Sequence, residues 1–256
     1  MGHIPTSYTL ALTSDGLKAA RIGVIRQAMD AKTNTASEDY SKVRTVMDKA
    51  IHELKKLGAD LVDPVTIPDV IDRLNMAYDG NLFETEPAIN AYLAQNANSP
   101  VKTLREILLS GKVAPSRARV LMNSVGKSTD DAGYAQVQRI AESTRQAVLT
   151  LMADYNLDAL VYATFDHQPV PIAPDVMTKP VVDDDRLGNN RRLSPIVGFP
   201  AMTVPAGFTT DGLPVGIEFM ARPFAELMLF RFANAYEQGT HHRRPPASTP
   251  ALRGEP

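Results

Sequence analysis

The residues best suited to chemistry lie in one irregular stretch, 165–195, which contains five prolines. Asp166 is followed directly by His167, and a carboxylate beside an imidazole can tune the proton affinity of the ring. Adjacent side chains point in different directions, however, so the two could equally serve separate contacts. Long loops inside compact domains frequently carry function. This stretch is therefore where a binding site is expected.

A substrate pocket is predicted from the two ends of this stretch. The run 158–163 is typical of a buried strand, and polar residues follow it directly, while a second polar group precedes the next strand. A phenylalanine there would offer an apolar surface, and asparagines would offer amide hydrogen bonds. An ordinary connecting loop has a similar composition, and that alternative stays open. The predicted pocket residues are Thr164, Phe165, Asp166, His167, Asn189, Asn190 and Ser194.

Other candidate groups carry weaker signals. Ser124 and Lys127 have the S-x-x-K spacing that places a serine and a lysine on one face of a helix, but Gly126 between them weakens such a helix. The run 183–185 is three aspartates, which could bind a hard cation but are more typical of a solvated turn. No metal site is therefore predicted.

The elements that must position these residues alternate between strand and helix. An apolar run at 20–26, a helix at 38–57 and a second strand at 59–65 predict a parallel α/β unit. In the helix, apolar residues recur at spacings of three and four, which places them on one stripe. Thr35 and Glu38 could form a capping box at its start, and Gly58 suits its end.

A helical excursion is predicted from about residue 70 to 129. Short helices are expected at 71–79, 85–95 and 104–109, and Pro87, Pro100 and Pro115 are each expected to end or kink a helix. A second long helix at 133–155 leads into the strand 158–163. A hairpin with strands 201–208 and 213–220 follows, turning at Asp211-Gly212. A closing helix is predicted at 224–237.

Composition bounds the class of protein. The 256 residues carry a net charge of −2 and 44% hydrophobic residues, so no electrostatic attraction to nucleic acid or to an anionic membrane is expected. No apolar run approaches the ~20 residues of a spanning helix, and no secretory signal is evident. The absence of cysteine fits a cytoplasmic protein. One domain, 1–256, is expected, with a lead-in at 1–19 and a flexible tail at 239–256 in which His241 and His242 are solvated.

Several short motifs occur in an order that resembles the second half of amidase-signature hydrolases. The resemblance implies an α/β fold, a mixed sheet flanked by helices, representing the C-terminal part of that family's core. It also implies hydrolysis of carboxylic amides without a metal or organic cofactor. The matching blocks are Arg21–Val24, Leu57–Ala59, Asp158–Val161, Gly198–Gly207, Gly212–Ile217, Phe224–Glu226 and Ala235–Glu237.

The same resemblance implies that the catalytic groups lie elsewhere. The family's mechanism uses a nucleophilic serine, a second serine in a cis peptide, a lysine base and a glycine-rich loop that binds the oxyanion. This chain contains no glycine- and serine-rich signature and no two adjacent serines. We therefore expect a truncated amidase with no catalytic residue of its own, inactive alone. Its partners would be a small amide substrate and either the N-terminal half or a second copy of the chain. The alternative is a non-catalytic ligand-binding module.

Overall fold

The computed structural model describes residues 5–172, 174–175, 188–246 and 248–249. Its strands form one mixed sheet in the order β2-β1-β3-β5-β4, and this confirms the predicted α/β class. β1 is parallel to both β2 and β3, and β5 is antiparallel to both β3 and β4. The strands are β1 (Arg21–Ile25), β2 (Asp60–Val65), β3 (Ala159–Ala163), β4 (Ala201–Phe208) and β5 (Pro214–Ala221).

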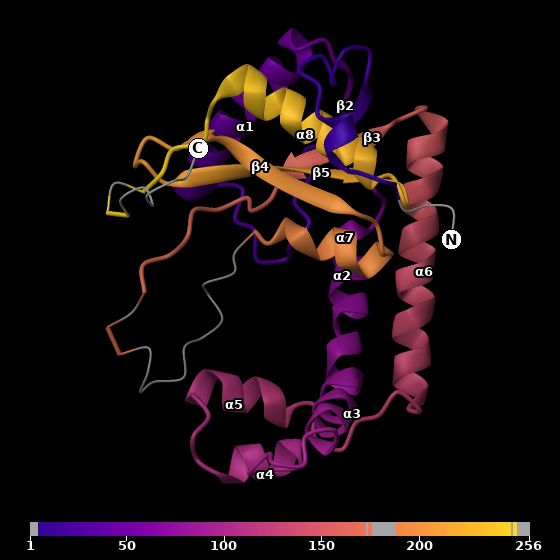
Figure 1. Ribbon diagram of the computed structural model, residues 1–256, viewed down its shortest axis with the longest axis vertical. Helices are drawn as coiled ribbons and strands as arrows, with labels where there is room; N and C mark the ends of the chain where they lie inside the picture. Colours follow the sequence, from indigo (N-terminus) through magenta and orange to yellow (C-terminus); the bar gives the residue numbers. More distant parts are fainter. Residues whose placement is uncertain (1–4, 173, 176–187, 247, 250–256) are drawn as a thin grey trace.

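Helices cover both faces of the sheet. Helices α1 and α8 pack on one face, and α2, α6 and α7 pack on the other (Figure 1). The helices are α1 (Glu38–Lys56), α2 (Val70–Tyr78), α3 (Gly80–Ala94), α4 (Leu104–Leu109), α5 (Pro115–Met122), α6 (Ala132–Asp154), α7 (Leu193–Val197) and α8 (Glu226–Thr240), with 3-10 turns η1 (Thr9–Ala11) and η3 (Asn190–Arg192).

β3 lies at the centre of the sheet and is buried on both faces. Ala159, Val161 and Ala163 belong to the core under α1 and α8, whereas Leu160 and Tyr162 belong to the core under α2, α6 and α7. This alternation follows from the two-residue period of a strand. It also explains why the sequence of β3 is apolar throughout, since a central strand has no face in water.

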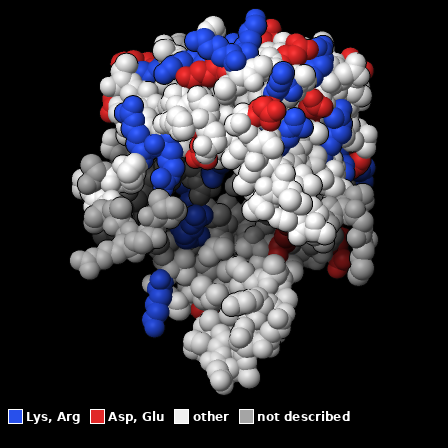
Figure 2. All heavy atoms as spheres, turned by 45° about the horizontal axis from the view of Figure 1, so that its top comes forward, with Lys and Arg blue, Asp and Glu red and all other residues white. Residues whose placement is uncertain are grey.

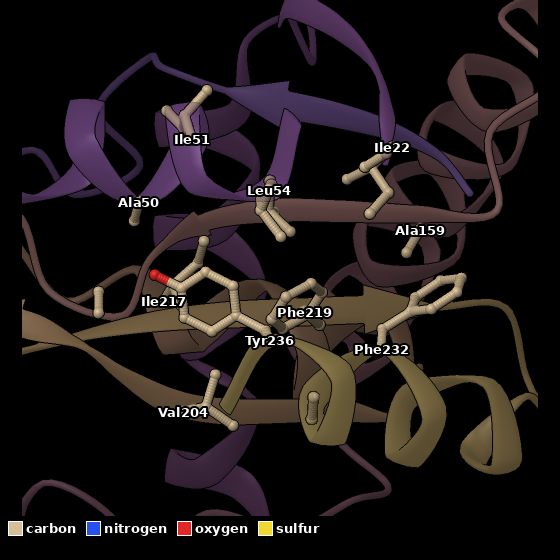
Figure 3. Packing of buried hydrophobic residues seen from close by; sticks show 14 of the residues in the cluster. Ile22, Ala50, Ile51, Leu54, Ala159, Val204, Ile217, Phe219, Phe232 and Tyr236 are labelled. Carbon is tan, nitrogen blue, oxygen red and sulfur yellow. The ribbon is translucent and has the colours of Figure 1, made fainter. Parts of the chain in front are cut away.

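Helix α1 places one apolar stripe against the sheet, with Leu54 and Ile51 above β5 and α8 in Figure 3. Its first turn holds Glu38 and Asp39 and its last turn holds Lys55 and Lys56, a distribution that complements the helix dipole. The predicted capping box of Thr35 and Glu38 was wrong. Ser37 is the N-cap, and its hydroxyl accepts a hydrogen bond from the Tyr40 N–H at 3.1 Å.

The helical excursion lies at the far end of the molecule from the sheet, and α2 and α6 run side by side toward it (Figure 1). The prediction that Pro115 ends or kinks a helix was wrong. Pro115 begins α5, because the first helical position needs no N–H donor and favours the φ of proline. Pro87 lies inside α3, which starts at Gly80, so it does not end that helix.

The C-terminal end of α8 is tied to α1. His241 is exposed as expected, but the prediction that His242 is solvated was wrong. The His242 Nε2 lies 2.8 Å from Glu53 Oε2, and the Tyr236 hydroxyl donates to the same oxygen at 3.0 Å. Because Glu53 belongs to α1, this contact joins two segments that are far apart in the sequence.

Candidate functional site

Thr164, Phe165, Asp166, His167, Asn189 and Asn190 lie together at the carboxyl end of β3 and form one cluster, to which Ser194 does not belong. The segment after β3 pairs with residues 188–190: the Asp166 N–H donates to the Gly188 carbonyl at 2.8 Å, and the Asn190 N–H donates to the Thr164 carbonyl at 3.2 Å. Phe165 and Asn189 face each other in an antiparallel bridge. Ser194 is separate, because its hydroxyl donates to the Phe199 carbonyl at the end of α7.

Gly188 permits this close pairing. Its φ is +65°, and a Cβ there would lie 2.8 Å from Asp166 Cβ and 2.9 Å from His167 Cδ2. Such contacts are far shorter than van der Waals distance, so any larger residue would push the two segments apart. The sequence predicted a loop over 165–195, but residues 190–195 of it fold into η3 and the start of α7, and neither element was predicted.

Asp166 is buried and only partly satisfied. Burial raises the pKa of its carboxyl from 3.8 to about 6, although a hydrogen bond from Asn190 and the charge of Arg44 oppose the rise. Within the described residues Asp166 Oδ2 has no hydrogen-bond partner, and neither has the side-chain oxygen of Asn190. The Asn190 amide donates to the Ala163 carbonyl at 2.9 Å, which fixes its orientation. The cluster therefore contains two buried acceptors that could receive a donor.

His167 faces a different set of partners. Its Nε2 accepts a hydrogen bond from the Asn34 backbone N–H at 3.1 Å, and its Nδ1 lies 3.5 Å from the Ser37 hydroxyl. Burial lowers the pKa of the imidazole, which favours the neutral ring that this acceptor role requires. Asp166 is not a partner of His167 among these contacts, so the adjacent pair does not act as a dyad.

A series of hydrogen-bonded polar side chains crosses the sheet beside the cluster, and it was not predicted from the sequence. The Tyr162 hydroxyl donates to Glu218 Oε1 at 2.9 Å, and the Thr203 hydroxyl donates to Glu218 Oε2 at 3.1 Å. The Thr164 hydroxyl donates in turn to the Thr203 oxygen at 3.2 Å. Burial raises the pKa of Glu218, while these hydrogen bonds and the charge of Arg191 lower it. The sequence did contain one sign of this network: Glu218 is the single charged residue in the otherwise mostly apolar strand β5.

This chain of hydrogen bonds should contribute to stability in a way that two variants separate. Glu218→Ala leaves the fully buried Tyr162 hydroxyl without its oxygen acceptor, at an expected cost of about 1–3 kcal/mol in the free energy of unfolding before any cavity is counted. Glu218→Gln keeps an acceptor for the Tyr162 hydroxyl and offers the Thr203 oxygen an amide N–H in place of the acceptor that it removes, so its cost should be clearly smaller. Urea unfolding of both variants measures the difference, and equal losses would contradict this account.

A cavity of about 510 Å³ opens next to the cluster. The junction of α2 and α3, the first half of α6 and the segment 189–196 form its walls. Figure 2 shows the surface hollowed between the sheet-bearing part and the lower part of the molecule, with Lys or Arg atoms inside. Asn189 belongs both to the cluster and to this wall. The polar lining includes Tyr78, Asn81, Glu84, Gln138, Arg191 and Arg192.

The alternative serine–lysine site does not form. Ser124 is buried in a turn, and its hydroxyl donates to the Leu121 carbonyl at 2.7 Å. The Lys127 ammonium lies 5.0 Å from the ring centre of Phe83, where it makes a cation–π contact instead of activating the serine. Gly126 has a φ of +79°, which breaks the helix that the spacing would need.

In the part of the chain that the structure describes, no three histidine, cysteine, aspartate or glutamate side chains are grouped so that they could hold a metal ion. The aspartate run 183–185 lies outside the described residues. No helix among the described residues is both long enough and apolar enough to span a membrane.

Two proteins are similar in sequence to most of this chain. A probable amidase of Arabidopsis thaliana is 26% identical over 251 residues, which are 93% of this chain and 42% of the plant protein. A glutamyl-tRNA(Gln) amidotransferase subunit from Ralstonia pickettii is 30% identical over 223 residues, which are 80% of this chain and 43% of the bacterial protein. The chain thus spans less than half the length of either relative.

Solved structures share the fold. The native peptide amidase of Stenotrophomonas maltophilia superposes with a TM-score of 0.73 at 26% identity, over 95% of this chain and 48% of the other. An amidase family protein of Bacillus anthracis superposes with a TM-score of 0.68, also at 26% identity, over 93% of this chain and 42% of the other. Residues 5–230 match the family model described as Amidase. Since that match covers most of the sequence, the chain belongs to the Amidase family.

Proposed function

We propose that this chain is the C-terminal portion of an amide-hydrolysing fold and supplies part of its substrate pocket. The main support for this proposal is the match to the Amidase family over residues 5–230. The site geometry supports it, because buried amide and carboxyl groups at the end of β3 adjoin a cavity large enough for a small molecule. The substrates would be small carboxylic amides.

The attacking groups are proposed to come from a segment that these 256 residues do not contain. The chain has no two adjacent serines. It covers 41–49% of the length of the relatives described above and of other amidotransferase subunits like the Ralstonia protein. The hydroxyls of Ser194 and Ser124 both donate their protons to backbone carbonyls, so neither is poised as a nucleophile. On its own, the chain would therefore bind but not hydrolyse an amide.

Within the assembled fold, the residues of the cluster would face the substrate. A serine of the complementary segment would attack the amide carbonyl carbon, the C–N bond would break, and the protonated amine would leave before water released the acid. Thr164, Phe165, Asp166, His167, Asn189 and Asn190 are the proposed wall, and Ser194 supports the backbone behind it. The buried unpaired oxygens of Asp166 and Asn190 could accept hydrogen bonds from the substrate or the complementary segment.

Complementation tests this proposal. The chain is assayed for release of ammonia from primary amides, alone and after co-expression with the portion of the Stenotrophomonas peptide amidase that it does not cover. We expect no turnover by the chain alone and turnover by the pair. Splitting the peptide amidase at the same position and co-expressing its own two parts is the positive control. Enzymatic turnover by the chain alone would contradict the proposal.

A non-catalytic ligand-binding role is the second candidate, and the cavity of about 510 Å³ with two arginines in its wall favours it. Saturable ligand binding by the chain, together with no turnover in a complementation experiment whose positive control succeeds, would support this role over hydrolysis.

A further inference from the structure

Two consecutive arginines in the cavity wall lack acidic partners within the described residues. Arg191 and Arg192 belong to η3 and line the cavity. Neither forms an ion pair in the described part of the chain, whereas Arg21, Arg26 and Arg105 each pair with a carboxylate. The charge of Arg191 does act on Glu218, whose pKa it lowers, but the two form no ion pair within the described residues. A guanidinium group that lines a cavity and has no ion-pair partner is suited to bind an anion from solution.

Arg191 is held in position by neutral contacts. Its guanidinium carbon lies 4.6 Å from the ring centre of Phe165, and its Nε donates to Asn189 Oδ1 at 3.3 Å. These contacts use the aromatic face and one N–H group, so the two terminal NH₂ groups have no hydrogen-bond partner among the described residues. The side chain is therefore oriented while most of its donors stay available.

Arg192 is held by contacts of the same kind, with residues of α2. Its guanidinium carbon lies 4.4 Å from the ring centre of Tyr78, and its Nη1 donates to Asn75 Oδ1 at 3.3 Å. Its Nε is buried and has no partner in the described part of the chain. Because both arginines stack on aromatic rings, little side-chain freedom remains to be lost when a ligand binds.

The remaining lining does not neutralise the two charges. Glu84 is the one acidic residue of the cavity wall within the described chain, and one of its oxygens accepts a hydrogen bond from the Tyr134 hydroxyl at 2.6 Å. Asn81 and Gln138 add neutral amides that could bind the rest of a polar ligand. Among the described residues, the wall thus carries two arginines and one glutamate, an excess of positive charge in a protein whose net charge is −2.

From this arrangement we infer that the cavity binds a carboxylate group of a small organic molecule. Carboxylate matches the planar fork of a guanidinium group, which can donate two parallel hydrogen bonds to it. Resting on the proposed function, the inference names a substrate class: amides that also carry a free carboxylate. The site lies between η3 and the α2–α3 junction, next to the cluster at the end of β3.

Titration calorimetry of the 256-residue chain tests the site directly. The probes are succinate and its uncharged diamide, succinamide, at low ionic strength. Succinate is expected to bind, succinamide to bind much more weakly, and added sodium chloride to weaken succinate binding. Arg192→Gln should raise the Kd for succinate roughly 10- to 100-fold, since a hydrogen bond to a charged group is lost. Arg191→Gln should act in the same direction.

Arg73→Gln is the matched control. Arg73 lies on α2 near the cavity, but it donates to the Pro68 carbonyl and the Ser143 hydroxyl and does not line the wall. This variant removes the same charge and should leave the Kd for succinate within about twofold. Thermal melts check that each variant folds. If Arg192→Gln unfolds the protein, the binding measurement is made with Arg191→Gln instead, because Arg191 is exposed and its replacement should not disturb folding.

Three results would overturn the inference: no succinate binding by folded protein, equal binding of the diamide, or equal effects of the Arg73 and cavity variants. Failure of the proposed function would look different. If the complemented enzyme hydrolyses neutral amides as fast as carboxylate-bearing ones, the inference fails and the function stands. If succinate binds through Arg191 and Arg192 but no complemented pair hydrolyses any amide, the site stands and the function fails.

Discussion

Replacement of Leu54 by alanine is expected to lower the free energy of unfolding by about 2–5 kcal/mol. Leu54 is fully buried in α1, where it packs among residues of the sheet and of α8 (Figure 3). Removal of its branched end takes away apolar contacts and leaves a cavity that the surrounding helices and strands can only partly fill. Urea-induced unfolding followed by circular dichroism measures the change in midpoint and free energy.

Leu109→Ala is the control for this prediction. The substitution is chemically identical and also lies in a helix, α4, but Leu109 is 86% exposed. Its effect should stay within about 0.5 kcal/mol. Similar losses at the two positions would mean that α1 does not pack on the sheet as described, and that the core beneath α1 and α8 is not the main source of stability.

Asparagine in place of Asp166 is expected to stabilise the protein at neutral pH. The carboxyl has a pKa of about 6 in the folded protein and 3.8 as its ordinary value, so the folded state binds a proton more tightly than the unfolded state. The stabilising effect of the protonated form is complete below about pH 3.8 and is lost as the pH rises through 6. At pH 7.5 the ionised carboxylate therefore costs up to about 3 kcal/mol, which Asp166→Asn removes.

The difference between Asp166→Asn and the natural chain should depend on pH. It should be largest above pH 7 and fall toward zero near pH 4, where the natural carboxyl is protonated and resembles the amide. Measuring unfolding across this range isolates the one group, because all other titrating groups are common to both proteins. Asp130→Asn, at an exposed turn, is the matched surface control. A difference that does not vary with pH would contradict the burial of an ionised Asp166.

If both the Asp166 and the arginine experiments succeed, they describe two neighbouring sites that share Asn189. Asp166 and Asn190 hold buried acceptors in the cluster and are not among the residues that line the cavity, whereas Arg191 and Arg192 line it. Hydrolysis would still require the attacking groups that the chain is proposed to receive from a complementary segment.

Local patterns were enough to predict the five strands and the long helices, but not α5, η3 or α7. The stripe of α1, the apolar run of β3 and the Asp211-Gly212 turn between β4 and β5 each depend on residues that are neighbours in the chain, so their periods are visible in the sequence. The predictions of helix ends failed where the same residue type is compatible with more than one position in a helix. Proline can end a helix or begin one, and Pro115 begins α5. Serine and threonine can both cap a helix, and Ser37 does so.

The sequence by itself also determined which residues would lie after β3, because their position in the chain follows from the strand that precedes them. Only the tertiary structure decided what each of those residues contacts. Glu218 meets Tyr162 because β5 pairs antiparallel with β3, and Arg192 meets Tyr78 because α7 packs on α2. Such contacts depend on sheet order and helix packing between segments far apart in the chain, and no periodicity along the sequence records them.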